Sequence, residues 1–185
     1  DRICVRAPFH PVDKTIPIDI LIEPKMSFGT AHHETTAQML SLIADMDVES
    51  KRVMDMGCGT AVLAILAKKM GAREITAVDN DEWAYNNAIE NLALNGMPGT
   101  EVIMGDARVL ENRMFDIIFA NINRNILLED IPAYADSLEN EGYLLLSGFY
   151  EHDLEMIDIK CRSENLEPQT SRTQNQWTAA VYKKE

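Results

Sequence analysis

One stretch near the middle of the chain, residues 52–61, constrains the fold more than any other. Residues 53–56 form a short apolar run with the length of a buried strand. Two glycines separated by one residue, Gly57 and Gly59, follow it, and a helical pattern of apolar residues starts at Val62. A strand that runs through a glycine-rich turn into a helix brings backbone N–H groups close to a ligand in α/β folds. We therefore expect a ligand at this turn.

The spacing of small residues in the turn separates two classes of ligand. A dinucleotide-binding turn needs a third small residue where this chain has Val62, which is too large to pack helix against strand. The small residue falls one place earlier, at Ala61, and Asp55 stands two places before Gly57. This pattern resembles the D/E-x-G-x-G-x-G turn of class I S-adenosylmethionine-dependent methyltransferases, with Ala61 in place of the third glycine.

A second strand pattern supports a nucleoside ligand. Residues 74–78 read as a strand that ends at Asp79, twenty-two residues after Gly57. A carboxylate at the tip of this strand can accept hydrogen bonds from both hydroxyls of a ribose. The alternative is that Asp79 caps the following helix, although Asn80 and Asp81 could also do so.

Composition narrows the class of protein. With 185 residues the chain has room for one domain with a full core, or two at most, and its first residue is not Met, which indicates a fragment. It has no apolar run long enough to cross a bilayer and no signal-peptide pattern. The three cysteines, Cys4, Cys58 and Cys161, fit no metal or disulfide spacing, so we expect a reducing cytoplasm.

The chain is strongly acidic, with a formal net charge of −13. This charge argues against direct binding to a nucleic-acid backbone, which needs clustered Lys and Arg. A basic protein partner would be attracted at long range, whereas the simpler explanation is that the acidity keeps the protein in solution.

The organisation along the chain predicts a lead-in over residues 1–25 and a catalytic domain over residues 26–185. The lead-in has strand patterns at 3–6 and 18–22 and is too short to fold alone, so it packs on the catalytic domain or continues a further domain. The polar loop after it contains His32 and His33, but adjacent side chains rarely converge on one ion and no third ligand is suitably spaced, so we predict no metal. Thr35 and Thr36 either cap the next helix or face the ligand.

Strand and helix patterns alternate along the rest of the chain, which favours a parallel sheet covered on both faces. We expect strands at 100–104, 115–121 and 142–147, helices at 81–94, 123–138 and 150–163, and a closing hairpin of 166–172 and 176–183 that turns at 174–175. The 115–121 strand is the most apolar and therefore central, and Pro132 should break or kink the 123–138 helix. A parallel sheet that ends in an antiparallel hairpin matches the seven-stranded, mostly parallel, Rossmann-like sheet of class I methyltransferases.

Several candidate ligand residues follow the ends of these strands. Ligands of such sheets bind beyond the carboxyl ends of the strands, which is where Gly57, Asp79, Asp106 and Asn121 fall. Asp106 could accept a hydrogen bond from the exocyclic amine of adenine, or be an ordinary loop residue. Asn121 could orient the lone pair of a substrate amine, although it cannot act as a base; otherwise it caps a helix.

With these motifs in place, the chain from about Arg6 onward resembles the catalytic domain of the PrmA family, the bacterial methyltransferases of large-subunit ribosomal protein eleven. The motifs that carry this resemblance are the Pro-Lys-Met-Ser-Phe-Gly-Thr loop at 24–30 with His33, Thr35 and Thr36, then the turn at 55–61, Asp79, and Asn121 with Ile122. Ala31 and Ala61 stand where family members usually have glycine.

The resemblance implies a function and a set of site residues. It implies that S-adenosylmethionine is bound by Thr36, Gly57, Asp79 and Asn121, and that Asn121 also serves the reaction. Gly59 in the turn and Asp106 after its strand complete the expected cofactor-binding set. It further implies methylation of Lys ε-amines and an α-amine of a ribosomal protein, recognised by an additional N-terminal domain. We expect a cytoplasmic monomer that neither enters membranes nor binds nucleic acid directly. The rival hypotheses are a methyltransferase of RNA or small molecules, a nicotinamide oxidoreductase, and a non-catalytic nucleoside-binding module.

Overall fold

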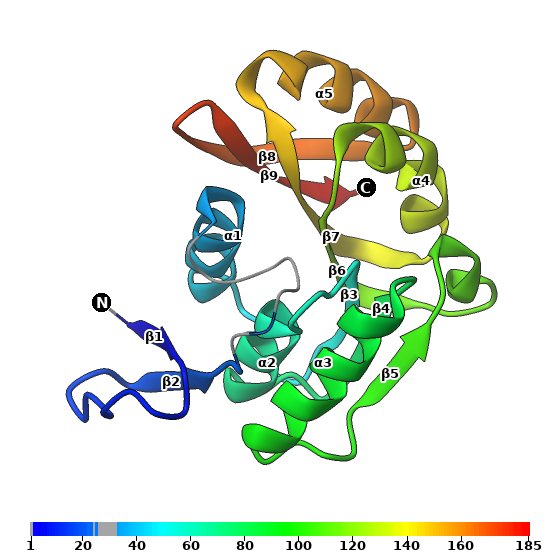
Figure 1. The fold of residues 1–185 in the computed structure, drawn as a ribbon. Coiled ribbons are helices and arrows are strands. Elements are labelled where there is room, and N and C mark those ends of the chain that lie inside the picture. The colour runs from blue at the N-terminus through cyan, green and yellow to red at the C-terminus, as the bar shows by residue number, and fades with distance from the viewer. Residues whose placement is uncertain (1, 24, 26–32) are drawn as a thin grey trace.

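A computed structural model describes residues 2–23, 25 and 33–185 of the chain (Figure 1). In chain order the elements are β1 Ile3–Arg6, β2 Ile18–Leu21, α1 Glu34–Ala44, β3 Arg52–Met56, α2 Val62–Lys69, β4 Glu74–Asp79, α3 Glu82–Leu94, β5 Glu101–Met104, the 3-10 helix η1 Ala107–Leu110, β6 Phe115–Asn121, α4 Arg124–Asp136, β7 Leu138–Tyr150, the 3-10 helix η2 Glu151–Asp153, α5 Leu154–Ser163, β8 Leu166–Gln174 and β9 Trp177–Lys184. The predicted loop at 24–30, apart from Lys25, and the predicted roles of Ala31 and His32 lie outside the described residues.

Seven strands form one mixed sheet in the order β5-β4-β3-β6-β7-β9-β8. The five strands from β5 to β7 in this order run parallel to one another, and β9 is antiparallel to both β7 and β8. The α/β fold with a terminal antiparallel hairpin is therefore confirmed. The 115–121 strand, β6, has three strands on either side, as its apolar sequence predicted.

Helices cover both faces of the sheet. Successive side chains of each buried strand point to opposite faces, so a single strand packs against helices on both sides. In β3, Val53 packs with residues of α1, α2 and α3, whereas Met54 packs with residues of α4 and α5. Neither side chain is exposed. The helices leave the carboxyl ends of the parallel strands facing a common edge, which is where the site lies.

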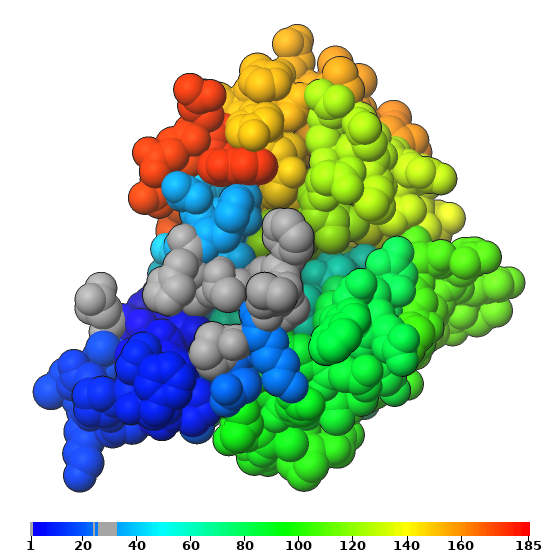
Figure 2. All heavy atoms as spheres, in the orientation of Figure 1, coloured from blue at the N-terminus to red at the C-terminus, as the bar shows by residue number. Residues whose placement is uncertain are grey.

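The lead-in packs on the main domain. Strands β1 and β2 pair in a small parallel sheet, and Ile20 is completely buried in the core beneath α2 and α3. The Asn95 side chain bonds both the N–H and the C=O of Leu21, and Oδ1 of Asn91 accepts from the N–H of Glu23. In the space-filling view the blue N-terminal segment adjoins the green surface that contains α3 (Figure 2).

Two predicted boundaries and the predicted effect of Pro132 differ from the structure. The 123–138 helix ends at Asp136, because Leu138 already pairs with Phe115 as the start of β7. Pro132 lies inside α4 without ending it, so of the two predicted effects, a break or a kink, the break is wrong. The 142–147 strand extends to Tyr150, which pairs with Trp177 and delays the next helix to residue 154. Strand pairing, rather than local pattern, sets both boundaries.

The closing hairpin turns one residue later than predicted. Gln174 and Trp177 are paired, so the two-residue turn is Asn175–Gln176. Both turn residues have positive φ, 50° and 68°, the sign that a tight type I′ hairpin turn requires. Because of this register, Trp177 is the first residue of β9. It lies beside Tyr150, at the end of the sheet where the parallel strands terminate.

No helix within the described ranges is long and apolar enough to cross a membrane. The three cysteines are free thiols, with Cys58 and Cys161 buried.

Candidate functional site

The turn between β3 and α2 is held in a conformation that suits glycine. Gly57 and Gly59 have φ of +68° and +53°. A Cβ atom on Gly57 would lie 2.4 Å from Cγ2 of Ile122, so even alanine would clash there. Ala61 also has positive φ, 62°, which costs an L-residue about 1 kcal/mol. The backbone at Ala61 therefore keeps the positive φ that glycine favours, although the third glycine of the methyltransferase motif is absent.

Hydrogen bonds from neighbouring elements fix this turn. The N–H of Cys58 donates to the carbonyl of Val78 in β4, at 2.9 Å. The buried carboxylate of Asp55 accepts from the N–H of Ala64 in the first turn of α2, at 3.0 Å. Because β3, β4 and α2 all hold the turn, its backbone is preorganised before any ligand arrives.

Asp79 lies at the end of β4 and does not cap α3. Its Oδ2 accepts from the N–H of Gly59 at 2.9 Å, and its Oδ1 accepts from the N–H of Asp81 at 3.0 Å. The cap is Asp81, which accepts from the N–H of Ala84. A carboxylate oxygen can accept two hydrogen bonds, so each oxygen of Asp79 can accept one more.

Asn121 at the end of β6 meets the first turn of α1. Its Nδ2 donates to Oγ1 of Thr36 at 3.3 Å. The alternative that Asn121 caps a helix is wrong, because Asn123 caps α4 by accepting from the N–H of Ile126. The alternative that Thr35 or Thr36 caps α1 is also wrong, since His33 fills that position and its ring nitrogen accepts from the N–H of Thr35.

Asp106 follows β5 and is bonded locally. It accepts hydrogen bonds from the backbone N–H and the guanidinium of Arg108, and the guanidinium contacts reach both carboxylate oxygens. The side-chain hydrogen bonds from Arg108 lower the pKa of Asp106 to about 2. Asp106 is therefore ionised at neutral pH and is paired with the exposed Arg108.

All of these segments surround one cavity of about 980 Å³. Every residue in the predicted cofactor-binding set lines it: Thr36, Gly57, Gly59, Asp79, Asp106 and Asn121. They come from α1, the β3–α2 turn, and the ends of β4, β5 and β6, so the fold brings together residues that are far apart in the sequence. The cavity wall also includes Trp83, Ile126 and Asp130 from α3 and α4.

The cavity is acidic. Its described lining holds five carboxylates, Asp55, Asp79, Asp81, Asp106 and Asp130, and neither lysine nor arginine. Burial, with a smaller contribution from the nearby charge of Asp79, raises the pKa of Asp55 to about 7, against the lowering effect of the hydrogen bond from Ala64. Burial also raises the pKa of the Cys58 thiol well above its usual range, so this residue fills space rather than attacking a substrate.

Two residues of this region were missed by sequence reasoning. Trp177 lines the cavity, and its ring contacts His33 edge-on and Tyr150 at a tilt, with ring centroids 5.1 and 4.2 Å away. Gly148 in β7 has φ of +94°, and a Cβ there would lie 2.2 Å from the carbonyl oxygen of Ile122. No local motif marks either residue, because each acquires its role through strand pairing.

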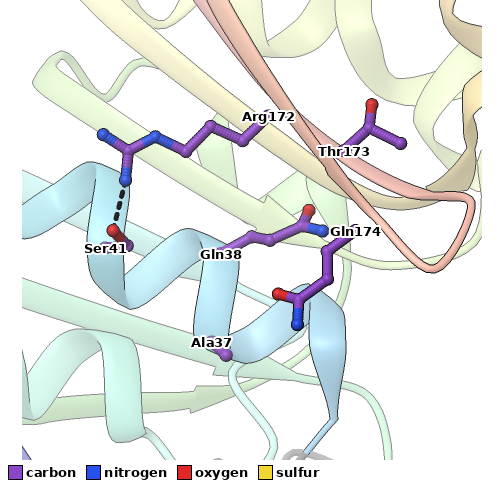
Figure 3. A pocket seen from close by; sticks show the side chains of 6 residues that line it. All are labelled: Ala37, Gln38, Ser41, Arg172, Thr173 and Gln174. Atoms are coloured by element: carbon purple, nitrogen blue, oxygen red, sulfur yellow. Dashed lines mark hydrogen bonds between the residues drawn. The ribbon is translucent and has the colours of Figure 1, made fainter.

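A second, smaller hollow of about 380 Å³ lies between α1 and β8 (Figure 3). There Arg172 donates to the hydroxyl of Ser41 and forms a 2.7 Å ion pair with Asp45. Gln38 donates from Nε2 to the carbonyl oxygen of Trp177 at 2.8 Å. These contacts join α1 to the hairpin and hold Trp177 at the cavity. Among the described residues, no group of three potential ligands could hold a metal ion.

The sheet order, the terminal hairpin and a cavity at the carboxyl ends of the parallel strands define the class I methyltransferase fold. The model of the family described as Ribosomal protein L11 methyltransferase (PrmA) matches residues 1–185. The chain belongs to this family.

Individual relatives agree with the family model. The chain is 51% identical to the ribosomal protein L11 methyltransferase of Porphyromonas gingivalis, over 97% of this chain and 62% of the relative. Identity to the Phocaeicola vulgatus protein of the same name is 44%, over 98% and 65%. The chain thus spans less than two thirds of the length of these curated relatives.

The crystal structure of ribosomal protein L11 methylase from Lactobacillus delbrueckii subsp. bulgaricus superposes with a TM-score of 0.90. The two chains are 27% identical, and the match covers 100% of this chain and 96% of that one.

Proposed function

We propose that the complete protein transfers methyl groups from S-adenosylmethionine to amines of ribosomal protein L11. Membership of the family supports the reaction and the substrate. The observation that carries the proposal is the convergence of all six predicted binding residues on one cavity, from elements up to 85 residues apart.

The cavity volume of about 980 Å³ lies within the usual range of ligand pockets, roughly 300–1,000 Å³, which supports the binding of a nucleoside cofactor. In our proposal the ribose hydroxyls donate to the free lone pairs of Asp79, and the turn at Gly57 and Gly59 lies against the nucleoside. The nicotinamide alternative is disfavoured, since Val62 occupies the position of the third small residue and is buried in the core. When bound, S-adenosylmethionine supplies an electrophilic methyl group on a positively charged sulfur.

The Asn121 end of the cavity receives the amine. Because Nδ2 donates to Thr36, Asn121 presents its Oδ1 as an acceptor to the substrate amine. One N–H held in this way directs the nitrogen lone pair toward the methyl group. Holding two reacting groups in line supplies roughly 7–11 kcal/mol of the barrier in favourable cases.

The amine has to lose its proton before it can react. A Lys ε-amine with an ordinary pKa near ~10.4 is only about 0.1% neutral near pH 7.4, which costs about 4 kcal/mol. We propose that removal of the ammonium group from water inside the cavity favours the neutral amine, and that the proton leaves to solvent. The transfer rate on a Lys substrate should then climb between about pH 7 and 9, with chemistry rate-limiting. A flat profile would contradict this mechanism.

An RNA substrate is the main competing proposal. The net charge of −13 and the acidic cavity oppose a phosphate backbone and favour a cationic amine. To separate the two, the complete protein would be incubated with isotope-labelled S-adenosylmethionine and either purified L11 or ribosomal RNA, and mass spectrometry would locate the label. Label on Lys ε-amines or an α-amine supports the proposal, and label only on RNA refutes it.

A non-catalytic nucleoside-binding role gives a different result in the same assay, namely cofactor binding without transfer to either substrate. The monomeric state, the cytoplasmic location, the lack of direct nucleic-acid binding and the division at residue 25 stay predictions.

A further inference from the structure

A second carboxylate that lines the cavity, besides those at the strand ends, comes from helix α4. Asp130 lies on α4 and lines the cavity together with Ile126, one helical turn earlier. Residues four apart in a helix share a face, so this face of α4 presents an apolar side chain and an acceptor side by side. An aromatic base with an exocyclic amine has the complementary chemistry.

Asp130 and Asp106 differ in how their oxygens are used. Both oxygens of Asp106 accept from the Arg108 guanidinium, with contacts of 2.7–3.1 Å, and one of them also accepts a backbone N–H. Asp130 accepts one hydrogen bond of 3.3 Å, from the Tyr134 hydroxyl to its Oδ2. Within the described part of the chain, Asp130 forms no salt bridge, whereas Arg108 neutralises Asp106.

The surroundings of Asp130 also favour a ligand donor. Burial raises the pKa of Asp130, and the charges of Glu129 and Asp106 add to this, only partly offset by the bond from Tyr134. A carboxylate that is half-buried without a cation gains stability from any N–H group that enters the cavity. Adenine has such a group in its exocyclic amine.

We propose that Asp130, rather than Asp106, accepts the hydrogen bond from the exocyclic amine of the adenine base, while Ile126 contacts the face of the ring. This inference rests on the proposed function, because it requires an adenosyl ligand in the cavity. It makes Asp130 a determinant of base specificity: replacement of the amine by an oxo group removes the donor and places a carbonyl oxygen against the carboxylate.

The test compares S-adenosylhomocysteine with S-inosylhomocysteine, in which an oxo group replaces the exocyclic amine and N1 carries a proton. Calorimetry on the complete protein should show that the wild type prefers the adenosyl compound by on the order of 10- to 100-fold, the usual effect of one hydrogen bond to a charged group. In Asp130→Asn the preference should fall to within about threefold of unity, because the amide can turn its N–H toward the oxo group.

Asp106→Asn is the matched control, since it makes the same chemical change at another carboxylate of the cavity. It should keep the wild-type preference even where it weakens both ligands. Melting temperatures of the ligand-free variants verify that both fold. The proposal is overturned if Asp106→Asn removes the preference, if both variants do so equally, or if the wild type binds both ligands alike. Failure of the wild type to bind either ligand would instead refute the proposed function itself.

Discussion

The side-chain amide of Asn121 donates to the hydroxyl oxygen of Thr36 across 3.3 Å, although 85 residues separate them in the sequence. This hydrogen bond joins the end of the central strand β6 to the first turn of α1. Both side chains line the cavity, so the contact sets the orientation of the Asn121 amide where the substrate amine is proposed to bind.

Substitution of Asn121 by Ala should lower kcat with L11 on the order of 100-fold, comparable to the loss of one preorganised polar group in other active sites. The dissociation constant for S-adenosylhomocysteine should rise by about tenfold at most, the loss of one hydrogen bond. Steady-state kinetics and calorimetry measure the two quantities. Asn125→Ala is the control, because Asn125 is exposed nearby on α4 and contacts only Arg124 among the described hydrogen bonds. Full activity in Asn121→Ala would place the reacting group elsewhere.

Substitution of Asp79 by Ala should raise the dissociation constant for S-adenosylhomocysteine by about 100-fold or more. The change removes the proposed acceptor for the ribose and the acceptor for the N–H of Gly59. Glu74→Ala makes a similar change at the other, exposed end of β4 and should leave binding unchanged. Unaltered binding in Asp79→Ala would show that the nucleoside does not occupy this edge of the sheet.

Asp55 should make the stability of the ligand-free protein fall as pH rises. Its pKa is about 7 in the folded state, against about 3.9 for an unfolded chain. Between these two pKa values the folded state holds a proton that the unfolded state has lost. The stabilising contribution of protonated Asp55 to the free energy of unfolding therefore declines as pH rises through this window, and it is fully lost above pH 7. The shift corresponds to about 4 kcal/mol.

Asp55→Asn cannot ionise but keeps an oxygen for the N–H of Ala64. The variant should therefore gain stability relative to the wild type between pH 4 and pH 8, as measured by urea unfolding at each pH. A constant difference across this range would mean that Asp55 has an ordinary pKa.

The acidic lining should make cofactor binding sensitive to salt. S-Adenosylmethionine carries one more positive charge than S-adenosylhomocysteine, and the described lining holds five carboxylates without a lysine or arginine. Raising the salt concentration from about 0.05 to 0.5 M should weaken binding of the charged compound more, because screening acts on the extra charge. Calorimetry with both compounds measures the ratio, and an unchanged ratio would contradict the expectation.

Gly148→Ala should destabilise the protein by more than about 2 kcal/mol, since the residue has positive φ and its Cβ would meet a backbone carbonyl. The contact is with Ile122, next to Asn121, so kcat should fall as well. Gly99→Ala, where a Cβ meets nothing within 4 Å, is the control and should be neutral or slightly stabilising. Equal stability of the two variants would show that β7 can move away from Ile122.

The sequence alone predicted the fold and the candidate residues because these depend on local patterns. The Gly57–Gly59 turn needs positive φ, the strands follow apolar runs, and ligand groups follow strand ends. The choice among helix caps could not be made in this way. Neighbouring Asx and Thr residues suit a cap equally, and the structure uses His33, Asp81 and Asn123 as caps rather than Thr35, Thr36, Asp79 or Asn121.

Only the tertiary structure decided which distant side chains meet. Trp177 reaches the cavity because the hairpin turns at Asn175–Gln176, and Gly148 is required because β7 passes against Ile122. Asp130 lines the same cavity as Asp106, 24 residues earlier in the chain, because α4 packs against the 3-10 helix η1 that follows Asp106. Strand register and helix packing depend on the whole core, so no window of sequence contains these contacts.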